Sequence, residues 1–135
     1  MQRRMLPKLD QANRGFWTGG EREELCIDRC ADCGGFTHPP RLICRHCLSE
    51  NVEPTPVSGR GVIESFTVNY QKWAPDMEVP FVIARIRLQD AEGVILTSNV
   101  VNCDVNAVGI GDSVRVTFEH HDDVYIPVFE LVIGD

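Results

Sequence analysis

The chain has 135 residues, of which 43% are hydrophobic and 24% charged, a composition typical of a soluble globular protein and unlike that of a disordered one. No apolar run approaches the roughly 18 residues that cross a bilayer, and residues 1–11 lack the apolar stretch of a signal peptide. We therefore expect a cytoplasmic protein without membrane contact, built as one domain or two small ones.

The formal net charge of −7 is unevenly distributed along the chain. Residues 1–60 carry nine Lys or Arg and eight Asp or Glu, whereas residues 61–135 carry four and twelve, a net of −8. An acidic surface repels phosphate backbones, and neutralisation of phosphates supplies most of the non-specific affinity for nucleic acids. The charge distribution therefore disfavours a protein that binds nucleic acid.

In chain order, the first predicted element is a short helix over about residues 8–17. Leu9, Ala12 and Phe16 fall on one face of this helix. So short a helix is stable only when it packs on the rest of the protein. The chain divides into an N-terminal helical segment, a cysteine-rich ribbon and a strand-rich domain, predicted over residues 1–23, 24–57 and 58–135.

Four cysteines form two CxxC pairs separated by ten residues: Cys30, Cys33, Cys44 and Cys47. Each pair is typical of a knuckle whose two thiolates converge on one metal ion, and closed sites with four thiolates are structural zinc sites. A rubredoxin-like iron site would use the same ligands. Redox-active CxxC motifs or two disulfides are the alternatives without metal, and the cytosol disfavours disulfides. We predict one structural zinc ion in a closed site with no position for substrate.

The remaining cysteines and histidines are interpreted as parts of the fold rather than as metal ligands or catalytic groups. Cys26 is expected to be a strand residue beside the site, and Cys103 a small buried hydrophobic residue. His38 and His46 are expected at the surface, because four thiolates already complete a tetrahedral site. The His-His-Asp-Asp run at residues 120–123 is interpreted as a solvated hairpin, with a second metal site or a catalytic dyad as the alternative.

From Gly59 onward, β-branched and aromatic segments alternate with turn signals. The predicted strands lie at 61–69, 81–89, 93–101, 113–119 and 125–133. The longer connection between the third and fourth strands has room for a short helical turn. This pattern is typical of a mainly β, five-stranded barrel of the OB type, and a small open sheet or sandwich is the alternative.

Several motifs, taken in this order, resemble one protein family. They are the aromatic pair at residues 16–17, the ribbon sequence CADCGG–HPP–ICRHC, the Ser-Gly-Arg-Gly of 58–61 and the Ile-Gly-Asp of 110–112. They are similar to the zinc-ribbon/OB-fold proteins of bacteria and archaea that are described as acyl-CoA-associated. The resemblance covers nearly the whole chain and implies a rubredoxin-like zinc ribbon before an OB barrel. The extra Cys26 and the lack of a glycine after Cys47 are departures from the family pattern.

The resemblance also implies a function. Members of this family act as non-catalytic partners of thiolases, of sterol-carrier-type aldolases that shorten steroid side chains, or of hydroxymethylglutaryl-CoA synthase, and some are fused to hydratase subunits. We therefore expect an accessory subunit of a hetero-oligomer in lipid or aromatic catabolism. It would brace a thiolase-fold acyl-CoA enzyme and help to form the route for the CoA chain, with the catalytic residues in the partner.

Four residues are predicted to contact the partner or acyl-CoA: Phe16, Trp17, Lys72 and Trp73. Trp73 lies in a long loop between the first two barrel strands and is typical of an interface anchor; a tryptophan that plugs the barrel end is the other interpretation.

The alternative function is a nucleic-acid-binding zinc-ribbon/OB module, which needs a basic groove with stacking aromatic residues. A free-standing thioesterase or hydratase has no recognisable Ser/His/Asp or paired-carboxylate pattern here.

Overall fold

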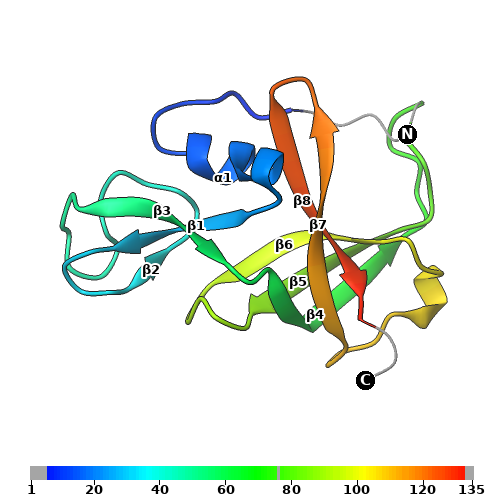
Figure 1. Cartoon of the computed structure of the whole chain (residues 1–135). Coiled ribbons are helices and arrows are strands. Elements are labelled where there is room, and N and C mark those ends of the chain that lie inside the picture. Colours follow the sequence, from blue (N-terminus) through cyan, green and yellow to red (C-terminus); the bar gives the residue numbers. More distant parts are fainter. Residues whose placement is uncertain (1–5, 76, 133–135) are drawn as a thin grey trace.

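The computed structural model describes residues 6–75 and 77–132, and it confirms the predicted mainly β fold (Figure 1). Helix α1 (Arg14–Thr18) and the 3-10 helix η1 (Gly19–Arg22) come first. The strands are β1 (Leu25–Cys30), β2 (Phe36–Thr37), β3 (Val52–Val57), β4 (Arg60–Asn69), β5 (Phe81–Leu88), β6 (Ile95–Val101), β7 (Ser113–His121) and β8 (Val124–Leu131), with the 3-10 helix η2 (Val105–Ala107) before β7. The first three strands form a sheet in the order β2-β1-β3, and the others form a closed barrel in the order β4-β5-β6-β8-β7.

The N-terminal helix is shorter than predicted, since it begins at Arg14 rather than near residue 8. The reason is a local turn. The backbone N–H of Asn13 donates to Asp10 Oδ1 and the backbone N–H of Asp10 donates to Asn13 Oδ1, both at 2.8 Å. Such side-chain bonds offer the backbone an alternative to the helix. No helix of the described residues is long and apolar enough to span a membrane.

The barrel follows the predicted alternation. In β5, the apolar residues Val82, Ala84, Ile86 and Leu88 are buried, and the arginines between them are exposed. The barrel closes through short ladders. β4 pairs with β7 over three residues, and β6 runs parallel to β8 with only two residue pairs, Val100 with Phe129 and Val101 with Glu130.

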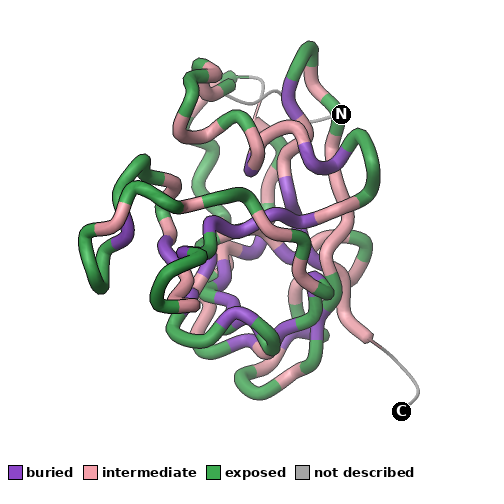
Figure 2. Tube along the Cα trace, turned by 60° about the vertical axis from the view of Figure 1, so that its left-hand side comes forward, coloured by how far each residue is buried: buried purple, intermediate pink, exposed green. Residues whose placement is uncertain are grey.

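The ribbon packs onto the barrel rather than around a core of its own. Leu25 and Ile27 of β1 belong to the same buried cluster as Phe16 of α1 and the inward residues of the barrel. Figure 2 shows that the buried positions follow the barrel strands and β1, while much of the ribbon tip is exposed. The N-terminal segment, the ribbon and the barrel therefore share one hydrophobic core.

Polar contacts at the turn between β5 and β6 hold the ribbon and the linker after it. The backbone N–H and the hydroxyl of Ser58 donate to the two carboxylate oxygens of Asp90, at 2.8 and 3.0 Å. The guanidinium of Arg45, in the second knuckle, donates to the carbonyl of Gly93 at 3.2 Å. These bonds join the ribbon to one end of the barrel.

Gly20 seats the N-terminal segment against the β7–β8 hairpin. A Cβ atom at this position would lie 2.4 Å from Cβ of Tyr125 and 2.7 Å from Cδ1 of Phe118. We expect Gly20→Ala to lower the free energy of unfolding by about 1–3 kcal/mol, because overpacking forces its neighbours to move. Urea unfolding measures this. Gly109→Ala is the matched control, since its nearest contact would be 3.6 Å away; equal losses in both variants would contradict this packing.

Candidate functional site

The structure brings the four predicted cysteines together. Their sulfur atoms all lie within 4.8 Å of one another, with Sγ–Sγ distances of 3.6 Å for Cys30–Cys47 and for Cys33–Cys44. Four sulfurs at Zn–S bonds of 2.3 Å form a tetrahedron with edges of about 3.8 Å, so the spacing fits one zinc ion. All six cysteines of the chain are free thiols. The donor set therefore matches a closed zinc site of four thiolates.

Each knuckle directs backbone N–H groups at sulfur. The N–H of Gly35 donates to Cys33 Sγ at 3.4 Å, and that of His46 donates to Cys44 Sγ at 3.3 Å. Such bonds favour the charged form of a thiol. The first bond reaches the second cysteine of its CxxC pair, and the other bond reaches the first cysteine of its pair.

The first cysteine of each knuckle is buried and has a lowered pKa. The backbone N–H of Cys33 lowers the pKa of Cys30. The backbone N–H of Cys47, followed by that of His46, lowers the pKa of Cys44 to about 6. Because the thiolate is the form that binds metal, the backbone favours the ligating state of both cysteines.

The missing glycine of the second knuckle has a structural consequence. Gly34, which follows Cys33, has φ of 76°, and Leu48, which follows Cys47, has φ of 66°. The N–H groups of both residues close equivalent turns, to the carbonyls of Cys30 and Cys44. A left-handed conformation costs a residue with a side chain roughly 1–2 kcal/mol. Leu48 therefore adopts the conformation that glycine adopts in the first knuckle.

Two polar side chains that the sequence analysis missed hold the second knuckle. The N–H of Arg41 donates to Asp28 Oδ2, and the N–H of Arg45 donates to Thr37 Oγ1, both at 3.2 Å. Asp28 and Thr37 are the buried polar residues of the described chain. Burial raises the pKa of the Asp28 carboxyl. No sequence pattern predicts these roles, because the partners of both side chains are backbone N–H groups that come near only when the loop is folded.

The other predicted cysteines and histidines have mixed outcomes. Cys26 is a buried strand residue of β1 outside the thiol cluster, and Cys103 is half-buried against the core. His46 is exposed, as expected. His38 is half-buried rather than exposed: its ring lies 5.0 Å from that of Phe16, and burial, with the charge of Arg45 second, lowers its pKa to about 4. The loop after β2 folds back over α1, which the sequence does not reveal.

The predicted contact residues are separated in space. Phe16 is 7% exposed and lies in the core, so it offers little surface to a partner. Trp17 is half-buried and meets Phe16 edge to face, with ring centroids 4.7 Å apart. Lys72 is exposed, and Trp73 is 74% exposed in the β4–β5 loop. Trp73 therefore does not plug the barrel.

The hairpin at residues 120–123 holds no site among the described groups. The His120 ring stacks on Tyr125 at 4.1 Å, and His121 contacts Glu119 at 3.2 Å. In the described part of the chain, the four thiols are the sole cluster of three or more His, Cys, Asp or Glu side chains placed to hold a metal. The hairpin interpretation therefore agrees with the structure.

Two family models match adjoining segments of the chain. Residues 17–53 match the ChsH2 rubredoxin-like zinc ribbon domain, and residues 54–119 match the ChsH2 C-terminal OB-fold domain. A DUF35 domain-containing scaffold protein of Methanothermobacter thermautotrophicus is 33% identical over 100 residues, which cover 73% of this chain and 74% of that protein. The chain belongs to the ChsH2/DUF35 family. The family resemblance predicted from the sequence is thus confirmed.

Two other relatives are much longer than this chain. A probable enoyl-CoA hydratase alpha subunit of Thermomonospora curvata is 30% identical over 131 residues, 96% of this chain and 40% of that protein. The 3-oxo-4,17-pregnadiene-20-carboxyl-CoA hydratase alpha subunit of Mycobacterium tuberculosis is 36% identical over 114 residues, which cover 84% of this chain and 36% of that protein. The chain spans less than half the length of these relatives.

A solved ChsH2/DUF35 structure matches nearly the whole chain. It is described as the Ltp2-ChsH2(DUF35) aldolase, and its matching chain has 28% sequence identity and a TM-score of 0.83. The match covers 95% of this chain and all (100%) of that chain. The N-terminal segment, the ribbon and the barrel therefore share their arrangement with that protein.

The ligand set can be tested by metal analysis. We expect one zinc per chain in the purified protein and its loss in Cys44→Ser, which removes a fully buried sulfur (0% exposed). Structural zinc contributes on the order of 10 kcal/mol to the folding of small sites, so the ribbon should also unfold. Cys26→Ser is the matched control and should retain the metal. Zinc lost from the control, or retained by Cys44→Ser, would show that a different set of cysteines binds it.

Proposed function

We propose that this chain is a non-catalytic accessory subunit of a thiolase-fold acyl-CoA enzyme, of the thiolase or retro-aldolase type. The observation that carries the proposal is the whole-chain similarity to one chain of the structure described as the Ltp2-ChsH2(DUF35) aldolase. The two relatives named as CoA hydratase alpha subunits support an acyl-CoA enzyme as the partner, and the relative named as a scaffold protein supports a non-catalytic role.

The chemistry of the described residues supports a non-catalytic role. The clustered thiols form a closed site, and a metal with four thiolate ligands has no open position for water or substrate. We assign a structural role to zinc on this ground. The nucleophile and the acid–base groups of the reaction would belong to the partner.

Exposed apolar side chains support a role in assembly. Tyr70 and Trp73 are 66% and 74% exposed in the β4–β5 loop. The Trp73 indole N–H donates to Asn69 Oδ1 at 3.2 Å, which orients the ring while leaving its face open. Leu42, Ile43 and Leu48 flank the second knuckle and are exposed at the opposite end of the molecule (Figure 1).

A protein with apolar groups at both ends is suited to bracing a larger enzyme, because buried aromatic anchors dominate interface energies. We propose that Trp73, with Lys72 beside it, contacts the partner, and that Trp17 contributes from the other side of the barrel. In such a complex, this chain would lie beside the channel that holds the CoA part of the substrate in the partner enzyme. The three predicted parts, 1–23, 24–57 and 58–135, would then act as one rigid unit in the hetero-oligomer.

A co-expression experiment tests the partnership. The chain and a thiolase-fold acyl-CoA enzyme from the same organism should co-purify, and Trp73→Ala should weaken their association at least roughly 10-fold, because tryptophan anchors are frequent hot spots. Its free energy of unfolding should change by less than about 0.5 kcal/mol, since the side chain is exposed. Calorimetric titration and urea unfolding measure the two effects.

Ile110→Ala is the matched control, because Ile110 is also apolar and 72% exposed but lies before β7. It should bind normally. Equal weakening by both substitutions would move the interface away from the β4–β5 loop. Failure of the wild-type chain to associate with any thiolase-fold enzyme would refute the proposed function.

The alternative, a nucleic-acid-binding module, receives less support. Residues 61–135 have four Lys or Arg against twelve Asp or Glu, and only Lys72 accompanies the exposed aromatic residues of the β4–β5 loop. We expect no binding of single-stranded DNA or RNA tighter than about 10⁻⁴ M at physiological salt, the weak end of non-specific affinity. A micromolar complex that weakens as salt rises, detected by fluorescence anisotropy, would reverse the ranking of the two functions.

A further inference from the structure

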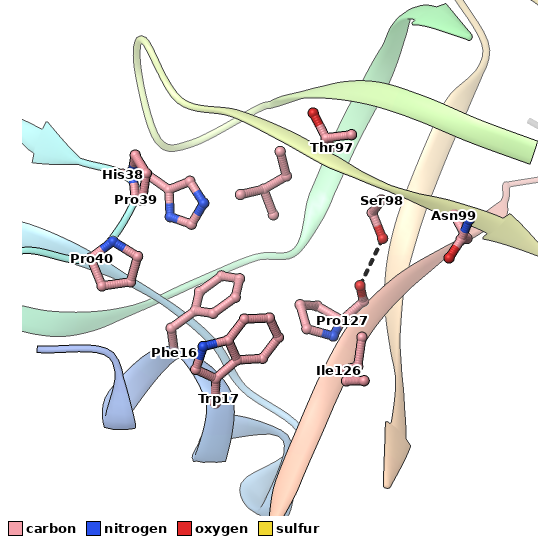
Figure 3. Close-up of a pocket in the computed structure, with 11 residues that line it drawn as sticks. Phe16, Trp17, His38, Pro39, Pro40, Thr97, Ser98, Asn99, Ile126 and Pro127 are labelled. Atoms are coloured by element: carbon pink, nitrogen blue, oxygen red, sulfur yellow. Dashed lines mark hydrogen bonds between the residues drawn. The ribbon is translucent and has the colours of Figure 1, made fainter. Parts of the chain in front are cut away.

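The closed barrel has its shortest ladder between β6 and β8. The two strands pair only at residues 100–101 and 129–130, and their preceding residues form no ladder pairs with each other. Pro127 has no N–H to donate, and the hydroxyl of Ser98 donates to its carbonyl at 2.7 Å. Helix α1 and the loop after β2 lie beside this stretch, and a cavity of about 260 Å³ is lined by them and by β6 and β8 (Figure 3).

The cavity has no charged side chain in its lining, although 24% of the chain is charged. Its apolar walls come from all three parts of the protein: Phe16, Trp17, Pro39, Pro40, Leu96 and Ile126. Proline rings and the edge-to-face pair of aromatic rings offer flat surfaces. A charged group would lose its hydration here without gaining an ion pair. The lining therefore selects an uncharged ligand with flat faces.

His38 is a half-buried polar residue in the wall of this cavity. Figure 3 shows its imidazole above Phe16, facing the space that Trp17 and Pro127 bound from the other side. Neither ring nitrogen forms a hydrogen bond with another described residue. Burial keeps its pKa near 4, so at pH 7 the ring is neutral and offers one donor and one acceptor. A half-buried polar group of this kind is satisfied by water or by a polar atom of a ligand.

We propose that this cavity binds a compact, uncharged ring that carries one hydroxyl or carbonyl group, with that group hydrogen-bonded to His38. The volume equals that of roughly nine water molecules at ~30 Å³ each and lies just below the usual range for ligand pockets, about 300–1,000 Å³. One ring, or two fused rings, fills it. The proposal is independent of the accessory function.

Proton–nitrogen NMR spectra of the full chain, at neutral pH, test the proposal with three matched probes. p-Cresol has the ring and the hydroxyl, toluene lacks the hydroxyl, and p-toluate carries a negative charge. We expect saturable shifts of the Trp17 indole N–H and of the amides of residues 96–99 with p-cresol, at a dissociation constant on the order of 1 mM. Toluene should bind more weakly at the same residues, and p-toluate should not shift them. Absence of saturable shifts with p-cresol, or equal binding of p-toluate, would overturn the proposal.

Two variants separate the role of His38 from that of the cavity. His38→Phe keeps a ring and removes the heteroatoms, so p-cresol should bind roughly 5- to 10-fold more weakly, while toluene binding is unchanged. Ile126→Trp fills the cavity and should abolish both. His46→Phe is the control, since His46 is exposed and lies outside the cavity lining. Spectra with native dispersion confirm folding of each variant; a p-cresol affinity that His38→Phe leaves unchanged would refute the hydrogen bond.

Discussion

Phe16, Leu25 and Ile27 lie in the same buried cluster as the inward residues of the barrel. The ribbon sheet has two long strands and the two-residue β2, and so small a sheet cannot bury enough apolar surface to be stable alone. Sharing the barrel core supplies that burial. The orientation of the ribbon, the position of α1 and the cavity between them all depend on this shared core.

The metal site combines covalent spacing with backbone geometry. The CxxC spacing brings two thiols together in each knuckle, and the ladder between β1 and β3 brings the second knuckle back to the first. Asp28 and Thr37 then hold the backbone that precedes and contains Cys44. A zinc ion at this site would tie the far end of the ribbon, where the apolar core does not reach.

The distribution of exposed apolar and acidic residues over the surface suits an accessory subunit. Apolar side chains are exposed at the ribbon tip and the β4–β5 loop, while acidic residues dominate residues 61–135. Contact residues at both ends of a rigid body fix its orientation on a partner. The uncharged cavity beneath α1 is a third surface of different chemistry, because it is concave and offers a hydrogen-bonding group among apolar walls.

The sequence by itself determined which four cysteines cluster, the order of ribbon and barrel and the five barrel strands, because CxxC spacing and two-residue alternation are local patterns. The strand bounds differ from the predicted ones by only a few residues. Only the tertiary structure decided that Phe16 is buried, that Trp73 is exposed and that His38 faces a cavity. These positions depend on contacts between segments distant in sequence, such as the loop after β2 and β6, which no local pattern encodes.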